Sequence, residues 1–463
     1  MNGRSFLDNG DWYLVSDDGA ARRKAVVSLD VGERFDELSR VFPYEEGKAY
    51  LVTFPPYTDE KESSLIFALH SSFVKRNDNW KRRHTGAAGA FLYLSKDIYQ
   101  TFFSKGGQGK NVLFLSQTSD RPGANLSALI QRMTERGLDQ DFHVTCRFHD
   151  DVTNGVSKLE LIKLARLIGK QDFIFVDNYI PILSLIDLPK GTKMIQVWHA
   201  GIGFKAVGYC RFGKSGSPHP SESSHRKYTT AAVPSEEAIP VFREVFAIEE
   251  EAFLPTGMPR LDGYYNPKRV AASRNAFFLS HPEWRDKKII LFAPTYRGSG
   301  QAEAYYDYGH LNFQQIREVC GDKWIFLIKM HPFVKEAPPI PDDCRDVIFD
   351  MSDVPDINDL FYVTDLLITD YSSAFYDYAG FGRPILFYTY DRRMYQLVRG
   401  VHRGVKETAP GKVCDTFEEL IRAIREEDFE LEKTKALQSS LLRKAANGSH
   451  SASDAVLECL FRK

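Results

Sequence analysis

Short apolar runs separated by polar or glycine-containing turns fill residues 1–108, among them WYLVS, AVVSLDV, AYLVTF, SLIFAL and AFLYLS. Runs of this length, rich in β-branched and aromatic residues and bounded by turn residues, predict β-strands. No longer helical pattern interrupts them. We therefore predict an accessory domain, β-rich and resembling a small β-sandwich, over residues 1–108, ending at the flexible SKGGQGK segment.

From residue 109 the pattern changes to strands that alternate with amphipathic helices. NVLFLS, DFIFVDN and TKMIQVWHA predict strands, whereas SKLELIKLARLIGK predicts a helix. A second series begins near residue 286 with KKIILFAPTYRG, WIFLIKMHP, DVIFD and DLLITD. Such alternation predicts parallel βαβ units. We expect an α/β protein with two Rossmann-like domains facing a cleft, residues 109–284 and residues 285–463, the second ending in C-terminal helices.

The charge is nearly balanced, with 60 Lys and Arg against 62 Asp and Glu. A strongly basic face is the usual mark of nucleic-acid binding, so the composition gives no support to a nucleic-acid partner. A hydrophobic share of 43% is typical of a folded globular protein. Any anion must therefore be bound by local groups.

The cysteines are scattered, with no Cys-x-x-Cys pair and no His at metal-ligand spacing: Cys146, Cys210, Cys320, Cys344, Cys414 and Cys459. This pattern is expected of reduced thiols inside the cell, and we predict no metal site from it. The N-terminus lacks an apolar signal core, and no apolar run is long enough to cross a bilayer. We expect a cytoplasmic protein that can rest on a membrane surface.

Two other segments are candidates for contacts with large substrates. The basic segment KRNDNWKRRH (75–84) suits anionic polymer or lipid headgroups, although such charge runs are more often solvated loops. The loop over residues 210–228 is rich in Ser, Gly and Pro. Because it follows a candidate catalytic loop, it is a candidate lid or acceptor guide.

Polar residues directly after predicted strands are the first candidates for a site, because ligands of open α/β sheets bind beyond the carboxyl ends of the strands. His199 ends one strand and is followed by a glycine-containing loop. An imidazole has an ordinary pKa of about 6.5 and suits a general base. The structural alternative is a histidine that only hydrogen-bonds to a carbonyl. Arg260 lies in a turn stiffened by Pro255 and Pro259, suited to phosphate recognition or to pairing with Asp262.

Two further strand ends carry cations. Thr295 and Arg297 follow one strand and suit phosphate binding, although the same residues favour a plain turn. Lys329 and His331 end another strand, and side chains two residues apart in a strand point to the same face. A buried Lys329 without a counter-ion would be costly, which predicts an anion nearby.

The stretch DLLITDYSSAFYDYAGFGRPILFY places Asp370, Ser372 and Ser373 where a strand passes into a helix. The unpaired amides of a first helical turn, with serine hydroxyls beside them, favour an anion. The structural alternative is that Asp370 or a serine caps the helix. Asp377, one turn further on, suits a pair of ribose hydroxyls.

Taken together and in this order, WHA with a following FK, TGMPR, APTYR, KMHP and TDYSSAFYDYAGFGRPILFYTYD resemble the CDP-glycerol glycerophosphotransferase family of teichoic acid and capsule synthesis. The resemblance covers about residues 110–440. It implies a GT-B fold in which an acceptor-side domain precedes a CDP-donor domain. It also implies transfer of a polyol phosphate, such as glycerol or ribitol phosphate, from a CDP-activated donor to a hydroxyl of a lipid-linked or polymeric acceptor, with release of CMP.

The resemblance assigns roles residue by residue. It implies catalytic roles for His199, as general base, and His331, and acceptor-side positions for Gly201 and Lys205. The donor-binding residues that it implies are Trp198, Arg260, Pro294, Thr295, Arg297, Lys329, Met330, His331, Ser372, Ser373 and Asp377. It implies no permanently bound cofactor, and it leaves a divalent metal open.

One loop departs from the family pattern. Many members carry Trp-His-Gly-Thr-Pro-Leu-Lys, whereas this chain has Trp198-His199-Ala200-Gly201-Ile202-Gly203-Phe204-Lys205. The choice among glycerol, ribitol and other polyols therefore stays open. Two alternatives also stay open: a nucleotide-sugar glycosyltransferase or epimerase of the same fold, and a non-catalytic polymer-binding protein. The preferred hypothesis is a transferase at the cytoplasmic face of the membrane.

Overall fold

The structure, a computed structural model, describes residues 97–184, 186–199, 201, 204, 207–208, 224–264, 266–298, 303–392, 395, 402–442 and 451–461, and the backbone of three strands near the N-terminus. These strands, β1 (Arg4–Asp8), β2 (Asp11–Val15) and β3 (Arg22–Ala25), form an antiparallel sheet. Residues 97–102, at the end of the predicted β-sandwich, are helical instead, and Tyr99 and Phe103 pack in a buried cluster of the first half. The rest of the predicted β-sandwich lies outside the described residues. So do the basic segment 75–84 and most of the loop over 210–228.

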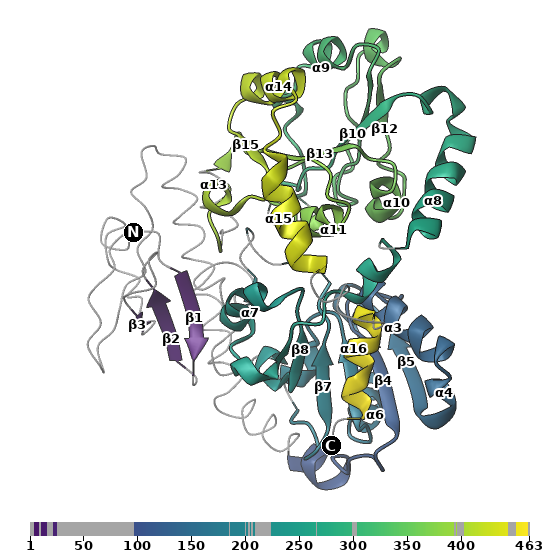
Figure 1. Ribbon diagram of the computed structural model, residues 1–463. Helices are drawn as coiled ribbons and strands as arrows, with labels where there is room; N and C mark the ends of the chain where they lie inside the picture. The colour runs from purple at the N-terminus through teal and green to yellow at the C-terminus, as the bar shows by residue number, and fades with distance from the viewer. Residues whose placement is uncertain are drawn as a thin grey trace.

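Two six-stranded parallel sheets, one in each half of the chain, form the frame of the molecule (Figure 1). The strands of the first sheet are β4 (Asn111–Ser116), β5 (His143–Phe148), β6 (Phe173–Val176), β7 (Lys193–Gln196), β8 (Thr230–Ala232) and β9 (Phe253–Leu254). Those of the second are β10 (Lys288–Phe292), β11 (Trp324–Ile328), β12 (Ile348–Asp350), β13 (Leu366–Thr369), β14 (Ile385–Tyr388) and β15 (Lys412–Cys414). The prediction of an α/β protein with parallel sheets is confirmed.

The strand order reverses once in each sheet. The orders are β5-β4-β6-β7-β8-β9 and β12-β11-β10-β13-β14-β15. The chain therefore turns from one direction of growth to the other between β4 and β6, and again between β10 and β13. Ligands of doubly wound sheets bind beyond the carboxyl ends of the strands at such a reversal. The loops after β4 and β6 in the first sheet, and after β10 and β13 in the second, are thus the places to examine first.

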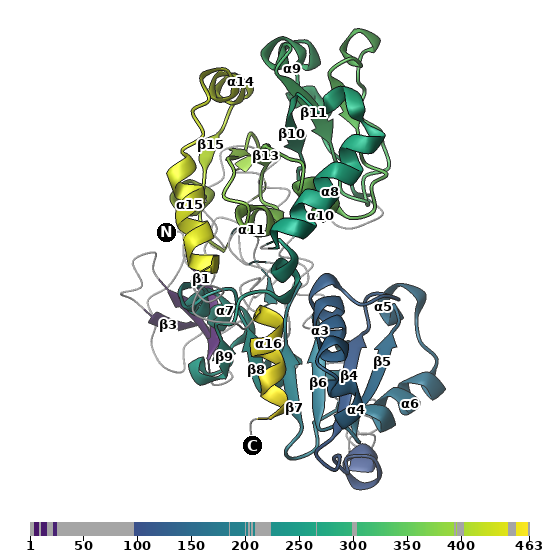
Figure 2. The same cartoon turned by 45° about the vertical axis from the view of Figure 1, so that its right-hand side comes forward.

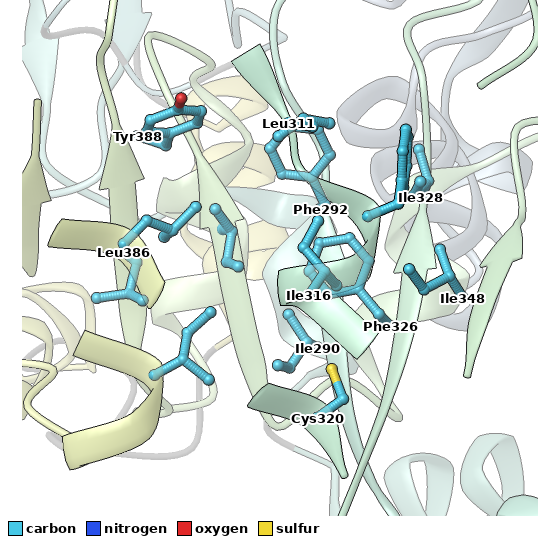
Figure 3. Close-up of a cluster of buried hydrophobic side chains, with 14 of the residues drawn as sticks. Ile290, Phe292, Leu311, Ile316, Cys320, Phe326, Ile328, Ile348, Leu386 and Tyr388 are labelled. Carbon is cyan, nitrogen blue, oxygen red and sulfur yellow. The ribbon is translucent and has the colours of Figure 1, made fainter. Parts of the chain in front are cut away.

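Both faces of the second sheet are covered, which explains why its strands read as continuous apolar runs. Ile290 and Phe292 point into one buried cluster with Phe326 (Figure 3). Ile289 and Leu291, the alternate residues of the same strand, point into a different cluster on the opposite face. Period-two alternation therefore sorts the side chains into two cores rather than into a core and a solvent face.

Helices pack on both sides of each sheet. In the first half they are α3 (Ala124–Glu135), α4 (Leu138–Asp141), α5 (Asp151–Asn154), α6 (Lys158–Ile168) and α7 (Ile239–Phe246). Further helices within the described residues are α8 (Pro267–Ser280), α9 (Phe313–Cys320), α10 (Ile357–Phe361), α11 (Ala374–Ala379), α13 (Val405–Thr408), α14 (Phe417–Glu426), α15 (Leu431–Leu442) and α16 (Ala452–Leu457).

Helix α14 illustrates how local sequence sets an element. Thr416 accepts from the backbone N–H of Glu419 while the Glu419 carboxylate accepts from the N–H of Thr416, a reciprocal capping box. Leu420 and Ile424, one turn apart, are buried against the second sheet. The helix ends at Glu427, whose φ of 52° is left-handed and cannot continue it.

Two helices lie in the half other than the one that the sequence predicted. Helix α8 precedes residue 285, yet Phe278 packs in the core of the second half. Helix α16 follows the second sheet but crosses back and lies beside α3 on the first half (Figure 1, Figure 2). Asp454 fastens it there through Arg132 and Arg136, at 2.8 and 3.0 Å.

A leucine substitution tests this crossing. Leu457 of α16 is fully buried in the first core, so Leu457→Ala should lower the free energy of unfolding by about 2–5 kcal/mol. Leu279→Ala is the matched control, because that side chain is 76% exposed and its loss should change little. Urea denaturation followed by circular dichroism measures both. Equal stability of the two variants would contradict the packing of α16 on the first half.

Candidate functional site

A pocket of about 180 Å³ opens between the two halves at the carboxyl ends of both sheets. It brings together seven residues predicted from the sequence. The first half contributes Trp198, His199 and Gly201, and the second half contributes Thr295, His331, Ser372 and Ser373. The full lining is Trp198, His199, Gly201, Phe204, Val207, Thr295, Tyr296, His331, Tyr371, Ser372, Ser373, Phe375 and Tyr376. Most of the other members are aromatic, which gives the pocket an apolar wall around its polar groups.

His199 is presented by a sharp turn at the end of β7. Trp198, just before it, has a φ of 47°, a left-handed conformation that costs a bulky residue about 1–2 kcal/mol. The turn is held because the Gln196 side chain accepts from the Trp198 N–H at 2.8 Å. The indole packs on Phe246 with ring centroids 5.1 Å apart. The reversal turns His199 outward, so its ring is exposed at the pocket while Trp198 is buried.

The tautomer of His199 follows from one hydrogen bond. Its Nδ1 lies 3.0 Å from the carbonyl oxygen of Asp177, which follows β6. A carbonyl only accepts, so Nδ1 carries the proton and Nε2 of the neutral ring carries the lone pair. The ring is therefore set up to accept a proton at Nε2.

His331 has the opposite tautomer. The backbone N–H of Phe333 donates to its Nδ1 at 3.2 Å, so the proton of the neutral ring is on Nε2. The ring is held between Tyr296 and Phe333, with centroids 4.7 and 4.6 Å away. One pocket thus contains a histidine that accepts at Nε2 and a histidine that donates there.

Lys329 does not line this pocket. Strand β11 ends at Ile328, so the alternation that predicted a shared face for Lys329 and His331 does not extend to them. The Lys329 ammonium donates to the carbonyl of Ser352 at 2.9 Å, and burial lowers its pKa while nearby carboxylates such as Asp350 oppose that shift. Met330 is in the hydrophobic core.

Asp370 ties the ends of the two central strands together. One of its carboxylate oxygens accepts from the backbone N–H and the hydroxyl of Thr295, at 2.8 and 2.5 Å. The same oxygen accepts from the N–H of Tyr371 at 2.6 Å. Thr295 therefore lines the pocket, but its hydroxyl proton is directed at Asp370. Pro294, just before it, is buried and outside the pocket lining.

Arg297 is buried behind the pocket. Its guanidinium donates to Asp370 at 3.0 Å and to both carboxylate oxygens of Asp391 at 2.5 and 2.9 Å. Four aromatic rings surround it at 5.1–5.7 Å, namely Tyr306, Tyr371, Tyr390 and Tyr395. The structure thus places Arg297 in an internal charge network and not at the pocket surface.

The two serines lie at the pocket where α11 begins. The Ser372 hydroxyl accepts from the N–H of Ala374 at 3.2 Å, so it also caps the turn. Ser373 is the residue before the first helical position, and its side chain makes no capping bond. Both hydroxyls are half-buried in the pocket wall.

Arg260 joins the two halves. Its guanidinium donates to Asp377 at 2.5 and 3.0 Å and to the backbone carbonyl of His199. Burial raises the pKa of Asp377, and the charge of Arg260 opposes that shift. Asp262, the alternative partner weighed for Arg260, instead accepts from Ala452 and Ser453 at the start of α16.

Gly201 is needed where the halves touch. A Cβ on this residue would lie 2.0 Å from the ring of Tyr376, so a side chain there would push the two walls apart. The close approach explains a glycine at this position. Lys205, the other predicted acceptor-side residue, lies outside the described residues.

Sequence reasoning missed two polar residues and the aromatic wall. Asp177 directly follows β6, and by the rule applied to the other strand ends it was a candidate site residue. Asn125 lies in the first turn of α3, and its partners are 72–135 residues away, so no local pattern marks it. The wall residues Phe375 and Tyr376 occur within a motif that was examined for its polar residues alone.

Within the part of the chain that the structure describes, no group of three His, Cys, Asp or Glu side chains is arranged to hold a metal ion. Among those same residues, no helix is both long and apolar enough to cross a bilayer.

Comparison with known families identifies the class of protein. The family model of CDP-glycerol:poly(glycerophosphate) glycerophosphotransferases matches residues 98–461. The chain belongs to this family, as the ordered motifs indicated.

Among the individual proteins that the chain resembles are two ribitol-phosphate polymerases. Teichoic acid ribitol-phosphate polymerase TarL of Staphylococcus aureus (strain NCTC 8325 / PS 47) is 36% identical over 344 residues, which are 74% of this chain and 61% of TarL. Teichoic acid ribitol-phosphate polymerase TarK of the same strain is 34% identical over 367 residues, 78% of this chain and 72% of TarK. The chain thus spans less than two thirds of TarL.

A solved structure shares the fold. A variant of the wall teichoic acid polymerase TagF superimposes with a TM-score of 0.59 at 16% identity, covering 88% of this chain and 97% of TagF. At that identity the likeness concerns the fold alone.

Asp177 provides a pH test of the site's electrostatics. Burial raises the pKa of its carboxyl to about 6, against hydrogen bonds from its own N–H and from Gly123 and against the charge of Arg260. The folded state then holds the proton more tightly than the unfolded chain, so stability falls as pH rises from about 4 to about 6. The loss at pH 7 is about 3 kcal/mol.

Asp177→Asn removes this titration. The free energy of unfolding of the variant, relative to that of the native protein, should therefore be higher at pH 7.5 than at pH 4. The exposed Asp286→Asn is the control, with no such change expected. Urea denaturation at the two pH values gives the difference. A pH-independent difference for Asp177→Asn would contradict the shifted pKa.

Proposed function

We propose that this chain transfers a polyol phosphate from a CDP-activated polyol to a hydroxyl of a teichoic-acid-type polymer or a lipid-linked acceptor, and releases CMP. Family membership supports the reaction class. The observation that carries the proposal is the pair of histidines at one pocket, one from each half, with opposite tautomers. We further propose that the two halves, near residues 109–284 and 285–463, work as the acceptor and donor domains of a GT-B enzyme.

His199 is the general base in this proposal. With Nδ1 directed at the Asp177 carbonyl, its Nε2 accepts the proton of the attacking hydroxyl. The acceptor oxygen forms a bond to the phosphorus that bears the polyol. The bond from that phosphorus to the bridging oxygen breaks, and CMP leaves with the electron pair. The transferred group keeps its polyol.

His331 stabilises the charge that develops on the diphosphate. Its Nε2–H is a donor from a ring that Phe333 and Tyr296 hold in place, so little reorganisation is needed during the reaction. The hydroxyls of Ser372 and Ser373 line the same wall and provide further donors. Removing one such donor typically costs about 10²–10³ in rate.

The other donor-binding residues divide into two groups. Trp198 and Thr295 line the pocket and are proposed to contact the donor through the indole edge and the Thr295 methyl. Arg260, Pro294, Arg297, Lys329, Met330 and Asp377 lie behind the lining. We propose that the buried set shapes the donor pocket, and that contact of Arg260 or Asp377 with the donor requires their ion pair to open.

The acceptor side is proposed to lie around Gly201 and Lys205. Both relatives described above are ribitol-phosphate polymerases, so we propose CDP-ribitol as the preferred donor and CDP-glycerol as the weaker one. The proposed acceptor is a polyol-phosphate polymer or its lipid-linked precursor, reached at the cytoplasmic face of a membrane. No permanently bound cofactor is proposed. Activity with EDTA and with added Mg²⁺ settles whether a divalent metal takes part.

The test of the proposed function is CMP release. Purified protein with CDP-ribitol or CDP-glycerol and a lipid-linked polyol-phosphate acceptor should release CMP, faster with CDP-ribitol. His199→Ala should reduce the rate by roughly 10²–10⁴, because general bases contribute about that much. His143→Ala is the matched control, since this exposed histidine begins β5 at the opposite end of the sheet.

Two results would count against the proposal. Full activity of His199→Ala would show that His199 is not the general base. Acceptor-dependent release of UDP from UDP-sugars, without any CMP from CDP-polyols, would favour a glycosyltransferase of similar fold.

A further inference from the structure

Asn125 is a buried side chain that hydrogen-bonds to three backbone groups in two other segments. It is in the first turn of α3 and is 1% exposed. Its amide nitrogen donates to the carbonyls of Val197 and Trp198, at 3.1 and 2.7 Å. Its amide oxygen accepts from the backbone N–H of Arg260 at 3.0 Å. Only this orientation of the amide satisfies all three partners, because carbonyls accept and an N–H donates.

The contacts of Asn125 lie on either side of a strained residue. Trp198 has a left-handed backbone with a φ of 47°, and such conformations persist only where the surroundings hold them. The Asn125 amide donates to the carbonyls of Val197 and Trp198, which flank the Trp198 Cα. The Gln196 side chain accepts from the Trp198 N–H between them. Without these hydrogen bonds, nothing would offset the strain of the Trp198 backbone, and the turn would relax away from the conformation that directs His199 at the pocket.

The same amide connects this turn to the opposite half. Asn125 fixes the backbone of Arg260, whose guanidinium reaches both the His199 carbonyl and Asp377 of the second half. The His199 turn is therefore held from two directions, through Asn125 directly and through Arg260. The amide lies behind the pocket and is not part of its lining.

We propose that Asn125 is a positioning residue that holds the Trp198 turn and so fixes the direction and tautomer of His199. This inference rests on the proposed function for its kinetic consequence. Its structural consequence, the tautomer of one imidazole, is independent of which substrate the protein uses.

The requirement is specific for asparagine. Asp has the same size and is favourable in the first turn of a helix, so Asn125→Asp preserves volume and helix. It loses both donors, however, and sets a carboxylate against two carbonyl oxygens. Gln171→Glu is the matched control: Gln171 is also a buried amide that donates to a carbonyl, Leu167 at 2.9 Å, but it lies near the amino end of β6.

The first measurement is ¹⁵N NMR of histidine-labelled protein, with the His199 signals identified by their loss in His199→Ala. We expect the Nδ1–H tautomer in the native protein and in Gln171→Glu, and a mixture of tautomers in Asn125→Asp. Melting temperatures confirm that each variant is folded. If Asn125→Asp does not fold, Asn125→Ala replaces it. An unchanged tautomer in a folded Asn125 variant would overturn the inference, whether or not the proposed function holds.

The second measurement is kinetic. Asn125→Asp should lower kcat for CMP release roughly 10- to 100-fold, as expected for a misplaced catalytic group, with KM for the CDP-polyol changed less than about threefold. In a His199→Ala background the same substitution should cause no further loss. Equal losses in both backgrounds would show a general structural effect and overturn the inference. Absence of CMP release from the native protein would instead reject the proposed function, and the NMR result would still decide the role of Asn125.

Discussion

The buried ion pair between Arg260 and Asp377 is the interaction on which the site depends. The side chains are only 7% and 10% exposed, and they come from opposite halves of the chain. Removing two charges from water is costly, and the cost is recovered only when their geometry and remaining hydrogen bonds are satisfied. The third bond of Arg260, to the His199 carbonyl, meets that condition and also holds the turn that carries His199. The position of His199 thus depends on how the two halves meet.

Other contacts hold the halves at that position. Glu244 of α7 pairs with Arg403 at 2.9 Å and with His402 at 2.5 Å, both from the second half. Burial raises the pKa of Glu244, but these partners outweigh it and lower the pKa to about 2, so the carboxylate is charged at neutral pH. Phe204 packs on Phe375 with ring centroids 4.9 Å apart. A polar contact and an apolar contact therefore connect the two halves. Helix α16 connects them as well, because it follows the second sheet in the sequence but packs on the first half.

Sequence patterns predicted the elements well, because hydrophobic periodicity reports burial directly. The apolar runs of four strands became β7, β10, β11 and β13, and polar residues that follow these strands met at one pocket: His199, Thr295, His331 and Ser372. The same reasoning could not assign Arg297 or Lys329. Both were correctly read as cations after strands, but their partners are set by tertiary packing. For Arg297 the partner Asp391 is 94 residues away, and for Lys329 the hydrogen-bond partner is a carbonyl 23 residues away, with carboxylates such as Asp350 nearby.

The central claim is that one donor diphosphate binds between His199 and His331. A crystal structure of the protein with a CDP-polyol bound tests it most directly. We predict that the diphosphate lies in the pocket lined by Ser372 and Ser373, with the His331 Nε2–H directed at a phosphate oxygen and His199 Nε2 facing the phosphorus that bears the polyol. A donor bound elsewhere, with His199 directed away from that phosphorus, would contradict the account.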